Sequence, residues 1–166
     1  MDAIEALLTR RSTRSYLDKP VEREKLDIIT DAGRRAASGM NTQGWHFSVI
    51  TNKEVIRKLG QFVQENDVSI CYDAPVFIIV SYEEGNKFGP YDTSCALQNM
   101  MVACHALGLG SVWINRINKN AEKAYMLTDY GVPSGHRAYG CLAVGYPLFS
   151  SLSLGPSAGY PTARHP

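Results

Sequence analysis

Residues 92–115 constrain the fold of this chain more than any other part of the sequence. Asp92 or Thr93 can cap a helix through a side-chain oxygen, and Gly108 can take the left-handed conformation that ends one. The residues that follow, Ser-Val-Trp-Ile, are typical of a buried strand. The sequence therefore predicts a helix, a tight turn and a strand in direct succession.

The predicted helix is apolar around nearly its whole circumference. Its apolar side chains are Ala96, Leu97, Met100, Met101, Val102, Ala103, Cys104 and Leu107. Its polar side chains Ser94, Gln98 and His105 fall within about 40° of one another at 3.6 residues per turn. Such a helix has to be buried on nearly all sides, so we expect a second subunit to share it.

Length and composition indicate a single ordinary domain. The chain has 166 residues, of which 45% are hydrophobic and 20% charged, and a formal net charge of +1. This charge gives no electrostatic reason to expect nucleic acid or an acidic membrane surface as a partner. The sequence shows no signal peptide and no apolar run of the roughly 18 residues that span a bilayer. We therefore expect a cytoplasmic protein.

The cysteines and histidines show no metal-ligand spacing. The cysteines lie far apart, in or next to apolar segments, and form no CxxC pair, so we expect small buried thiols rather than ligands. They are Cys71, Cys95, Cys104 and Cys141, and the histidines are His46, His105, His136 and His165. The sequence predicts no metal site.

A cluster of arginine and hydroxyl side chains follows a short amphipathic helix near the start of the chain. This arginine segment, residues 10–16, has the sequence RRSTRSY. Its donors suit an anion, and the planar guanidinium group suits phosphate in particular. A solvated run of charges, or a loop that faces a partner, is the alternative that composition leaves open.

A second polar stretch, residues 38–44, precedes a predicted strand. This amide loop has the sequence SGMNTQG, and its amides and small neighbours can present hydrogen bonds to a flat heteroaromatic ligand. An ordinary turn is the alternative.

The rest of the chain alternates helical and strand patterns. Helices are predicted over residues 2–9, 21–37, 54–64 and 121–127, with Leu26, Ile28, Ile29, Ala32 and Ala36 facing inward on the second. Strands are predicted from Trp45, over residues 76–80, over 111–114 and over 138–146, with a loop at 85–90. This pattern predicts an α+β layered sandwich. Motifs for dinucleotide, P-loop, serine-hydrolase and zincin sites are absent, so an enzyme of this sequence needs a cofactor to supply its chemistry.

Three separated segments resemble the FMN-dependent nitroreductase family. The arginine segment resembles the family's RRSxRxF opening, and residues 38–47 resemble its PSxxNxQPWxF loop. Residues 92–114 resemble its DxxxAxQNLxLAAxxLGLGSxWI helix and strand, and residues 145–147 resemble the GYP that closes its last core strand. The resemblance covers residues 2–147 in family order.

The resemblance implies a fold, a cofactor and an activity. The fold would be a nitroreductase-like sandwich with a mostly antiparallel central sheet, flanked by helices, in an intertwined homodimer with FMN at the subunit interface. The domain would span residues 1–147. The activity would be ping-pong hydride transfer from NADH or NADPH through flavin N5 to a nitroaromatic, quinone or similar electron-poor acceptor, with no catalytic side chain. A flavin-binding protein with a storage or sensing role is the alternative.

The resemblance also implies the cofactor-binding residues. Arg10, Arg11 and Ser12 match phosphate contacts, and Arg14 matches a basic residue beside the pyrimidine edge of the flavin. The partner chain's loop would contribute Ser38, Gly39 and Asn41, and the end of the strand would contribute Ile114 and Asn115.

Two features depart from the family pattern. Ala37 and Gly44 stand where the family commonly has proline, so we expect a more mobile amide loop. Residues 148–166 are rich in Ser, Gly and Pro and contain one arginine, Arg164, where the family has a basic tail that reaches the phosphate. We expect this tail to be mobile.

Overall fold

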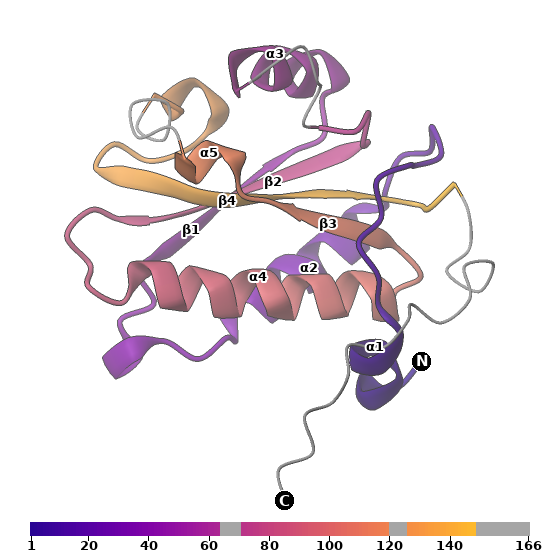
Figure 1. The fold of residues 1–166 in the computed structure, drawn as a ribbon, viewed down its shortest axis with the longest axis horizontal. Coiled ribbons are helices and arrows are strands. Elements are labelled where there is room, and N and C mark those ends of the chain that lie inside the picture. The colour runs from indigo at the N-terminus through magenta and orange to yellow at the C-terminus, as the bar shows by residue number, and fades with distance from the viewer. Residues whose placement is uncertain (64–70, 120–125, 149–166) are drawn as a thin grey trace, which may run out of the picture.

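The computed structural model describes residues 1–63, 71–119 and 126–148, which form a four-stranded antiparallel sheet with helices on both faces (Figure 1). The elements in chain order are α1 (Ala3–Thr9), α2 (Arg23–Arg34), η1 (Gly39–Asn41), β1 (Trp45–Ile50), α3 (Lys53–Val63), β2 (Val76–Glu83), α4 (Gly89–Ala106), β3 (Gly110–Ile114), α5 (Arg116–Lys119), η2 (Thr128–Tyr130) and β4 (His136–Gly145). The predicted α+β sandwich is confirmed.

The centre of the sheet is covered on both faces. The strand order is β1-β2-β4-β3, and β2 is buried at every position except its last. Alternate residues of β2 enter two different cores, because side chains alternate across a strand. Ile78 and Val80 join the core under α2 and α4, whereas Phe77 and Ile79 join the core under α3.

Helix α4 ends as predicted but begins earlier. The N–H groups of Gly108 and Leu109 donate to the carbonyls of His105 (3.0 Å) and Cys104 (2.8 Å), and Gly108 has a φ of 76°. This is the paired bond pattern that closes a helix on a left-handed glycine. At the other end α4 begins at Gly89, so the prediction that Asp92 or Thr93 caps it is wrong, and the predicted loop at 85–90 is shorter. Proline in the first turn explains the earlier start, since its missing N–H needs no partner there.

A single chain already buries most of α4. The sheet, α2 and α1 all pack against it (Figure 1), and Met100 and Met101 are 0% and 5% exposed. The exposed positions of α4 are Tyr91, Cys95, Asn99 and Ala106. A second subunit is therefore needed to cover only this outer side, and its presence stays a prediction.

Some predicted burials are wrong. Ile28 is 51% exposed, because α2 is covered on the side of Leu26 and Ile29 only. Cys95 is exposed, whereas the other three cysteines are buried as predicted.

Two other predictions lie wholly or mostly outside the residues that the structure describes. They are the helix at 121–127 and the tail at 148–166 with Arg164. Among the described residues, no helix combines the length and the apolar character needed to cross a membrane, and no three His, Cys, Asp or Glu side chains cluster as metal ligands.

Candidate functional site

The arginine segment runs beside the first residues of β3. The N–H of Thr13 donates to the carbonyl of Ser111 at 2.9 Å, and Ser12 pairs with Ser111 in a parallel bridge. A Cβ added at Gly110 would lie 2.6–2.7 Å from the side chain of Thr13, so only glycine allows this close approach. The segment is thus held against the sheet instead of forming a free loop.

Tyr16 fixes the far end of the arginine segment. Its hydroxyl lies 2.5 Å from the carbonyl oxygen of Thr13 and 3.1 Å from that of Ala143 in β4. Burial raises the pKa of the Tyr16 phenol well above its ordinary value, so the hydroxyl keeps its proton and remains a donor to these carbonyls.

The arginine side chains of the segment are available to an anion. Arg11 and Arg14 are exposed and Arg10 is half-buried. In the described parts of the chain none of the three has a carboxylate within ion-pair distance, although five ion pairs occur elsewhere. Three guanidinium groups with the Ser12 hydroxyl form the donor set that a phosphate group prefers.

His105, near the end of α4, lies beside the arginine segment. Its Nε2 lies 2.9 Å from Oγ1 of Thr9, and that hydroxyl donates to the carbonyl of Glu5 at 2.6 Å. Because the Thr9 proton is engaged, His105 Nε2 must be the donor. Burial, and then the charge of Arg10, lower the pKa of His105. The sequence indicates only that His105 belongs to a polar stripe of its helix, since nothing local shows that α1 lies beside it.

The amide loop is strained. Met40, Asn41 and Gln43 all have positive φ, at 51°, 56° and 49°, and each such non-glycine residue costs about 1–3 kcal/mol. Within the loop, the N–H of Gln43 donates to Ser38 Oγ at 3.2 Å, and Gln43 Nε2 donates to Asn41 Oδ1 at 2.8 Å. Strain of this kind gathers at ligand sites, which favours a binding role over an ordinary turn.

Asp92 ties the amide loop to α4. Its carboxylate is 4% exposed and accepts hydrogen bonds from the N–H of Gly39 at 2.9 Å and from Oγ1 of Thr42 at 3.4 Å. This role has no signature in the sequence, because a carboxylate near a helix start fits a cap equally well.

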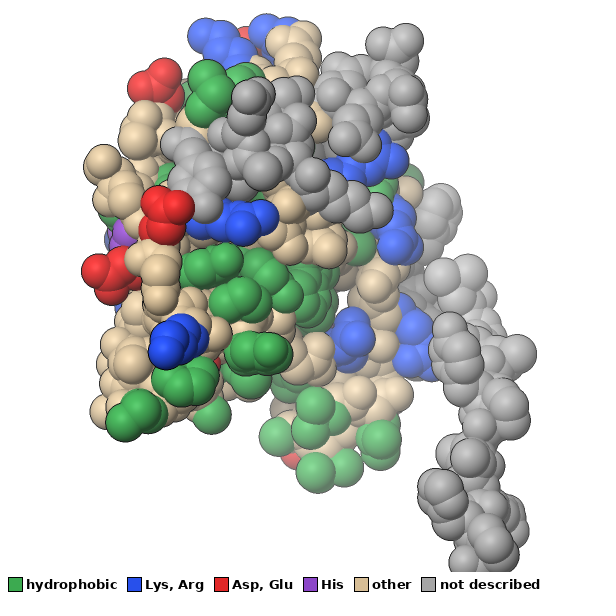
Figure 2. Space-filling model, turned by 60° about the vertical axis from the view of Figure 1, so that its left-hand side comes forward, with side chains coloured by type: hydrophobic (Ala, Val, Ile, Leu, Met, Phe, Trp, Pro, Cys, Tyr) green, Lys and Arg blue, Asp and Glu red, His purple; other side chains and the backbone are tan. Residues whose placement is uncertain are grey.

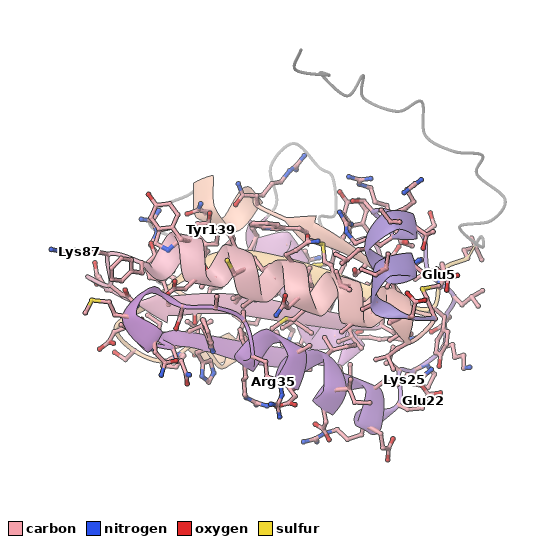
Figure 3. The ribbon with its side chains drawn as sticks, turned by 90° about the horizontal axis from the view of Figure 1, so that it is seen from below. Glu5, Glu22, Lys25, Arg35, Lys87 and Tyr139 are labelled. Atoms are coloured by element: carbon pink, nitrogen blue, oxygen red, sulfur yellow. The ribbon has the colours of Figure 1, made fainter. Side chains whose placement is uncertain are left out.

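The arginine segment and the amide loop lie at opposite ends of α4 (Figure 1). Lys87, just before α4, and Glu5, in α1, mark these two ends in Figure 3. The 18 residues of α4 span about 27 Å. Within one chain, Arg10, Arg11, Ser12 and Arg14 therefore do not meet Ser38, Gly39 and Asn41.

The end of β3 contributes two further residues named by sequence analysis. Ile114 is 5% exposed and its side chain belongs to the core under α3. Asn115 is exposed and its carbonyl accepts a hydrogen bond from the N–H of Asn118 at 3.2 Å. Of this pair, only Asn115 has an exposed side chain.

Hydrophobic side chains remain exposed on the outer side of α4 and on α1. Tyr91 is 72% exposed, and Ile4, Leu7 and Leu8 are 65%, 50% and 74% exposed. Figure 2 shows hydrophobic side chains gathered on one face of the molecule. Exposed groups of large hydrophobic side chains are candidates for interaction surfaces.

Comparison with known proteins gives consistent matches. A sequence model of the Nitroreductase family matches residues 7–67 and 63–146. A relative from Methanothermobacter thermautotrophicus, with the provisional name NADH dehydrogenase/NAD(P)H nitroreductase, is 35% identical over 89% of this chain and 78% of its own length. An FMN reductase [NAD(P)H] from Bacillus subtilis is 27% identical over 77% of this chain and 59% of its own length. The crystal structure of a nitroreductase with bound FMN from Bacteroides fragilis has a TM-score of 0.86 and 30% identity, and covers 100% of this chain and 98% of that one.

Proposed function

Because the chain belongs to the nitroreductase family, we propose that it is an oxidoreductase that binds FMN and takes electrons from NADH or NADPH. The observation that carries the cofactor assignment is the arginine segment, whose three guanidinium groups have no carboxylate partner in the described part of the chain. A bound FMN would pass hydride in two successive steps, from NAD(P)H and then to an electron-poor acceptor such as a nitroaromatic compound or a quinone.

The phosphate of FMN is the anion that we assign to the arginine segment. Arg10, Arg11 and Ser12 would donate to it, since they combine two forked cations with a hydroxyl group. The bridge between Ser12 and Ser111 and the close packing of Thr13 on Gly110 hold these donors against β3. Such preorganisation lowers the entropy that binding costs.

Arg14 has a separate role in this proposal. A reduced flavin carries negative charge around its pyrimidine edge, and a permanent cation near that edge stabilises the reduced form. Arg14 would supply this charge, and its guanidinium is exposed and unpaired among the described residues. No acid or base from the protein is required in this scheme.

We further propose that the active form is a homodimer. The two halves of the site lie at opposite ends of α4 within one chain, so a second chain is the simplest source of the missing half. An antiparallel arrangement of two α4 helices would bring Ser38, Gly39 and Asn41 of one chain to the arginine segment of the other. The exposed hydrophobic side chains of α4 and α1 are the surface that such a pairing would cover.

The strand end would complete the site. Asn115 is exposed directly after β3 and offers an amide, while Ile114 would contribute through its backbone because its side chain is in the core. Residues of both chains would then contribute to the flavin site.

Release and titration of the cofactor test the proposal. Cofactor-replete protein, once denatured, should release about one FMN per chain, and apoprotein should quench the fluorescence of added FMN at the same ratio. Steady-state oxidation of NADH and NADPH with a quinone acceptor then separates an enzyme from a protein that only stores flavin. A colourless protein that also ignores added FMN would refute the assignment.

A further inference from the structure

We propose that Asp92 is a positioning residue that sets the conformation of the amide loop and thereby the affinity for flavin, an inference that rests on the proposed function. The proposal is carried by one contact between distant parts of the chain. The N–H of Gly39 donates to Oδ1 of Asp92 at 2.9 Å, across 53 positions of sequence.

The carboxylate of Asp92 is buried, and the amide loop donates hydrogen bonds to it. Asp92 is 4% exposed, and a carboxylate removed from water requires hydrogen-bond donors. It lies in the first turn of α4, where the unpaired N–H groups and the helix dipole favour negative charge. Gly39 and Thr42 each donate a hydrogen bond to one of its oxygens.

The loop conformation is one that does not persist without external support. Three of the four residues from 40 to 43 have positive φ, namely Met40, Asn41 and Gln43. The bonds from Gln43 to Ser38 and Asn41 close the loop on itself, and they do not fix it to the rest of the fold. Asp92 bonds to Gly39, directly before the strained stretch, and to Thr42, within it.

The ring of Phe88 limits the alternatives open to the loop. A Cβ added at Gly39 would lie 2.3–2.7 Å from this ring, so the backbone at Gly39 is pressed between Phe88 and Asp92. Both residues belong to the start of α4. The start of α4 therefore limits where the loop backbone can lie, and Asp92 is the charged residue of α4 that bonds to the loop.

Three substitutions separate this role from general stability. Asp92→Leu removes both contacts. Asp92→Asn keeps an oxygen that can accept from Gly39 but loses the charge, which makes the bond weaker. Thr93→Val is the matched control, because Thr93 is 0% exposed one position away and, among the described residues, its hydroxyl donates to Gly89 and Pro90 within α4.

The first measurement is hydrogen exchange of the Gly39 amide in the apoprotein, with buried β2 amides as the internal reference. We expect exchange at Gly39 to be at least about ten-fold faster in Asp92→Leu and several-fold faster in Asp92→Asn. Exchange in β2 should stay within about two-fold in both variants, and Thr93→Val should change neither. Where Asp92→Leu fails to fold, Asp92→Asn answers the same question.

The second measurement is the FMN dissociation constant of the same variants. We expect it to rise at least about ten-fold in Asp92→Leu, less in Asp92→Asn and not at all in Thr93→Val. Unchanged exchange at Gly39 in a folded Asp92 variant would overturn the anchor. Faster exchange with unchanged FMN affinity would overturn the link to flavin. A wild-type protein that binds no FMN would instead refute the proposed function, and the exchange result would still decide the anchor.

Discussion

The hydroxyl of Tyr16 hydrogen-bonds to the backbone carbonyl of Ala143 at 3.1 Å, across 127 positions of sequence. Ala143 lies in β4, a central strand of the sheet, and Tyr16 ends the arginine segment. Together with the bond to the carbonyl of Thr13, this contact joins the candidate phosphate site to a central strand of the sheet.

Tyr16→Phe should therefore loosen the arginine segment. Loss of the hydroxyl removes two part-buried contacts with carbonyl oxygens, which should lower the free energy of unfolding by about 1 kcal/mol and weaken FMN binding several-fold. Tyr130→Phe is the control, because its half-buried ring packs on Phe62 rather than on the arginine segment. Denaturant titration and FMN titration measure the two effects, and equal behaviour of the two variants would contradict the prediction.

Arg10→Ala should chiefly weaken FMN binding. A charge-assisted hydrogen bond to phosphate contributes about 1.5–3 kcal/mol, so the dissociation constant should rise about 10- to 100-fold. Arg35→Ala is the matched control, because Arg35 is equally cationic but is paired with Asp31 at 2.8 Å on α2. Comparable losses in both variants would show that net charge, and not a phosphate contact, governs the affinity.

Arg14→Ala should affect the redox potential as well. If its cation lies near the pyrimidine edge, removing it destabilises the reduced flavin and lowers the midpoint potential. Arg10→Ala, saturated with FMN, provides the comparison, since phosphate-side charge is farther from the ring. The potential is measured by equilibration with a reference dye, and an unchanged value in FMN-bound Arg14→Ala would reject this role.

Cys95→Glu should give a folded monomer. Cys95 is exposed in the single chain, on the outer side of α4, so a carboxylate there is tolerated in a monomer but is desolvated in the proposed dimer. Ile28→Glu is the control, because Ile28 is an exposed apolar residue on α2. Sedimentation at micromolar concentration should show dimers for the wild type and Ile28→Glu only. A wild-type monomer that binds FMN would refute the shared site.

A charge at Met100 does not make the same test. Met100 is 0% exposed within one chain, so a buried carboxylate there would unfold the monomer itself, whether or not a dimer forms. The exposed side of α4 is therefore the place where dimerisation and folding can be separated.

His105→Gln should flatten the acid dependence of stability. Burial and Arg10 lower the pKa of His105 in the folded protein, so the unfolded chain binds this proton more tightly. Protonation of His105 therefore lowers the free energy of unfolding. The full free energy of unfolding is present above the unfolded pKa of about 6.5, and the His105 contribution is lost as pH falls through the lower folded pKa. The urea midpoint should consequently fall less between pH 8 and pH 5 in the variant. His136 has a lowered pKa too, so part of the dependence should remain, and an identical dependence in wild type and variant would contradict the prediction.

Local patterns in the sequence predicted most of the helices and strands of the fold. The continuous apolar run at 76–80 predicted a strand covered on both faces, and Gly108 predicted the end of α4. These features depend on side-chain alternation and on backbone conformations that only a few residues adopt, so they can be recognised from near neighbours. The FMN cofactor was predicted from the arginine segment and the amide loop together with the family resemblance.

Only the tertiary structure decided how those pieces act on one another. Asp92 looked like a helix cap, yet it is the anchor of a loop 53 positions earlier, and Ile28 looked buried, yet it faces solvent. Both depend on which elements pack side by side, and a carboxylate or an apolar side chain has the same local pattern in either role. The separation of the arginine segment from the amide loop by the length of α4 is likewise a property of the packed chain. The sequence by itself predicted which groups would bind a flavin, whereas packing decided that one chain holds those groups apart, because the 18-residue α4 helix lies between them.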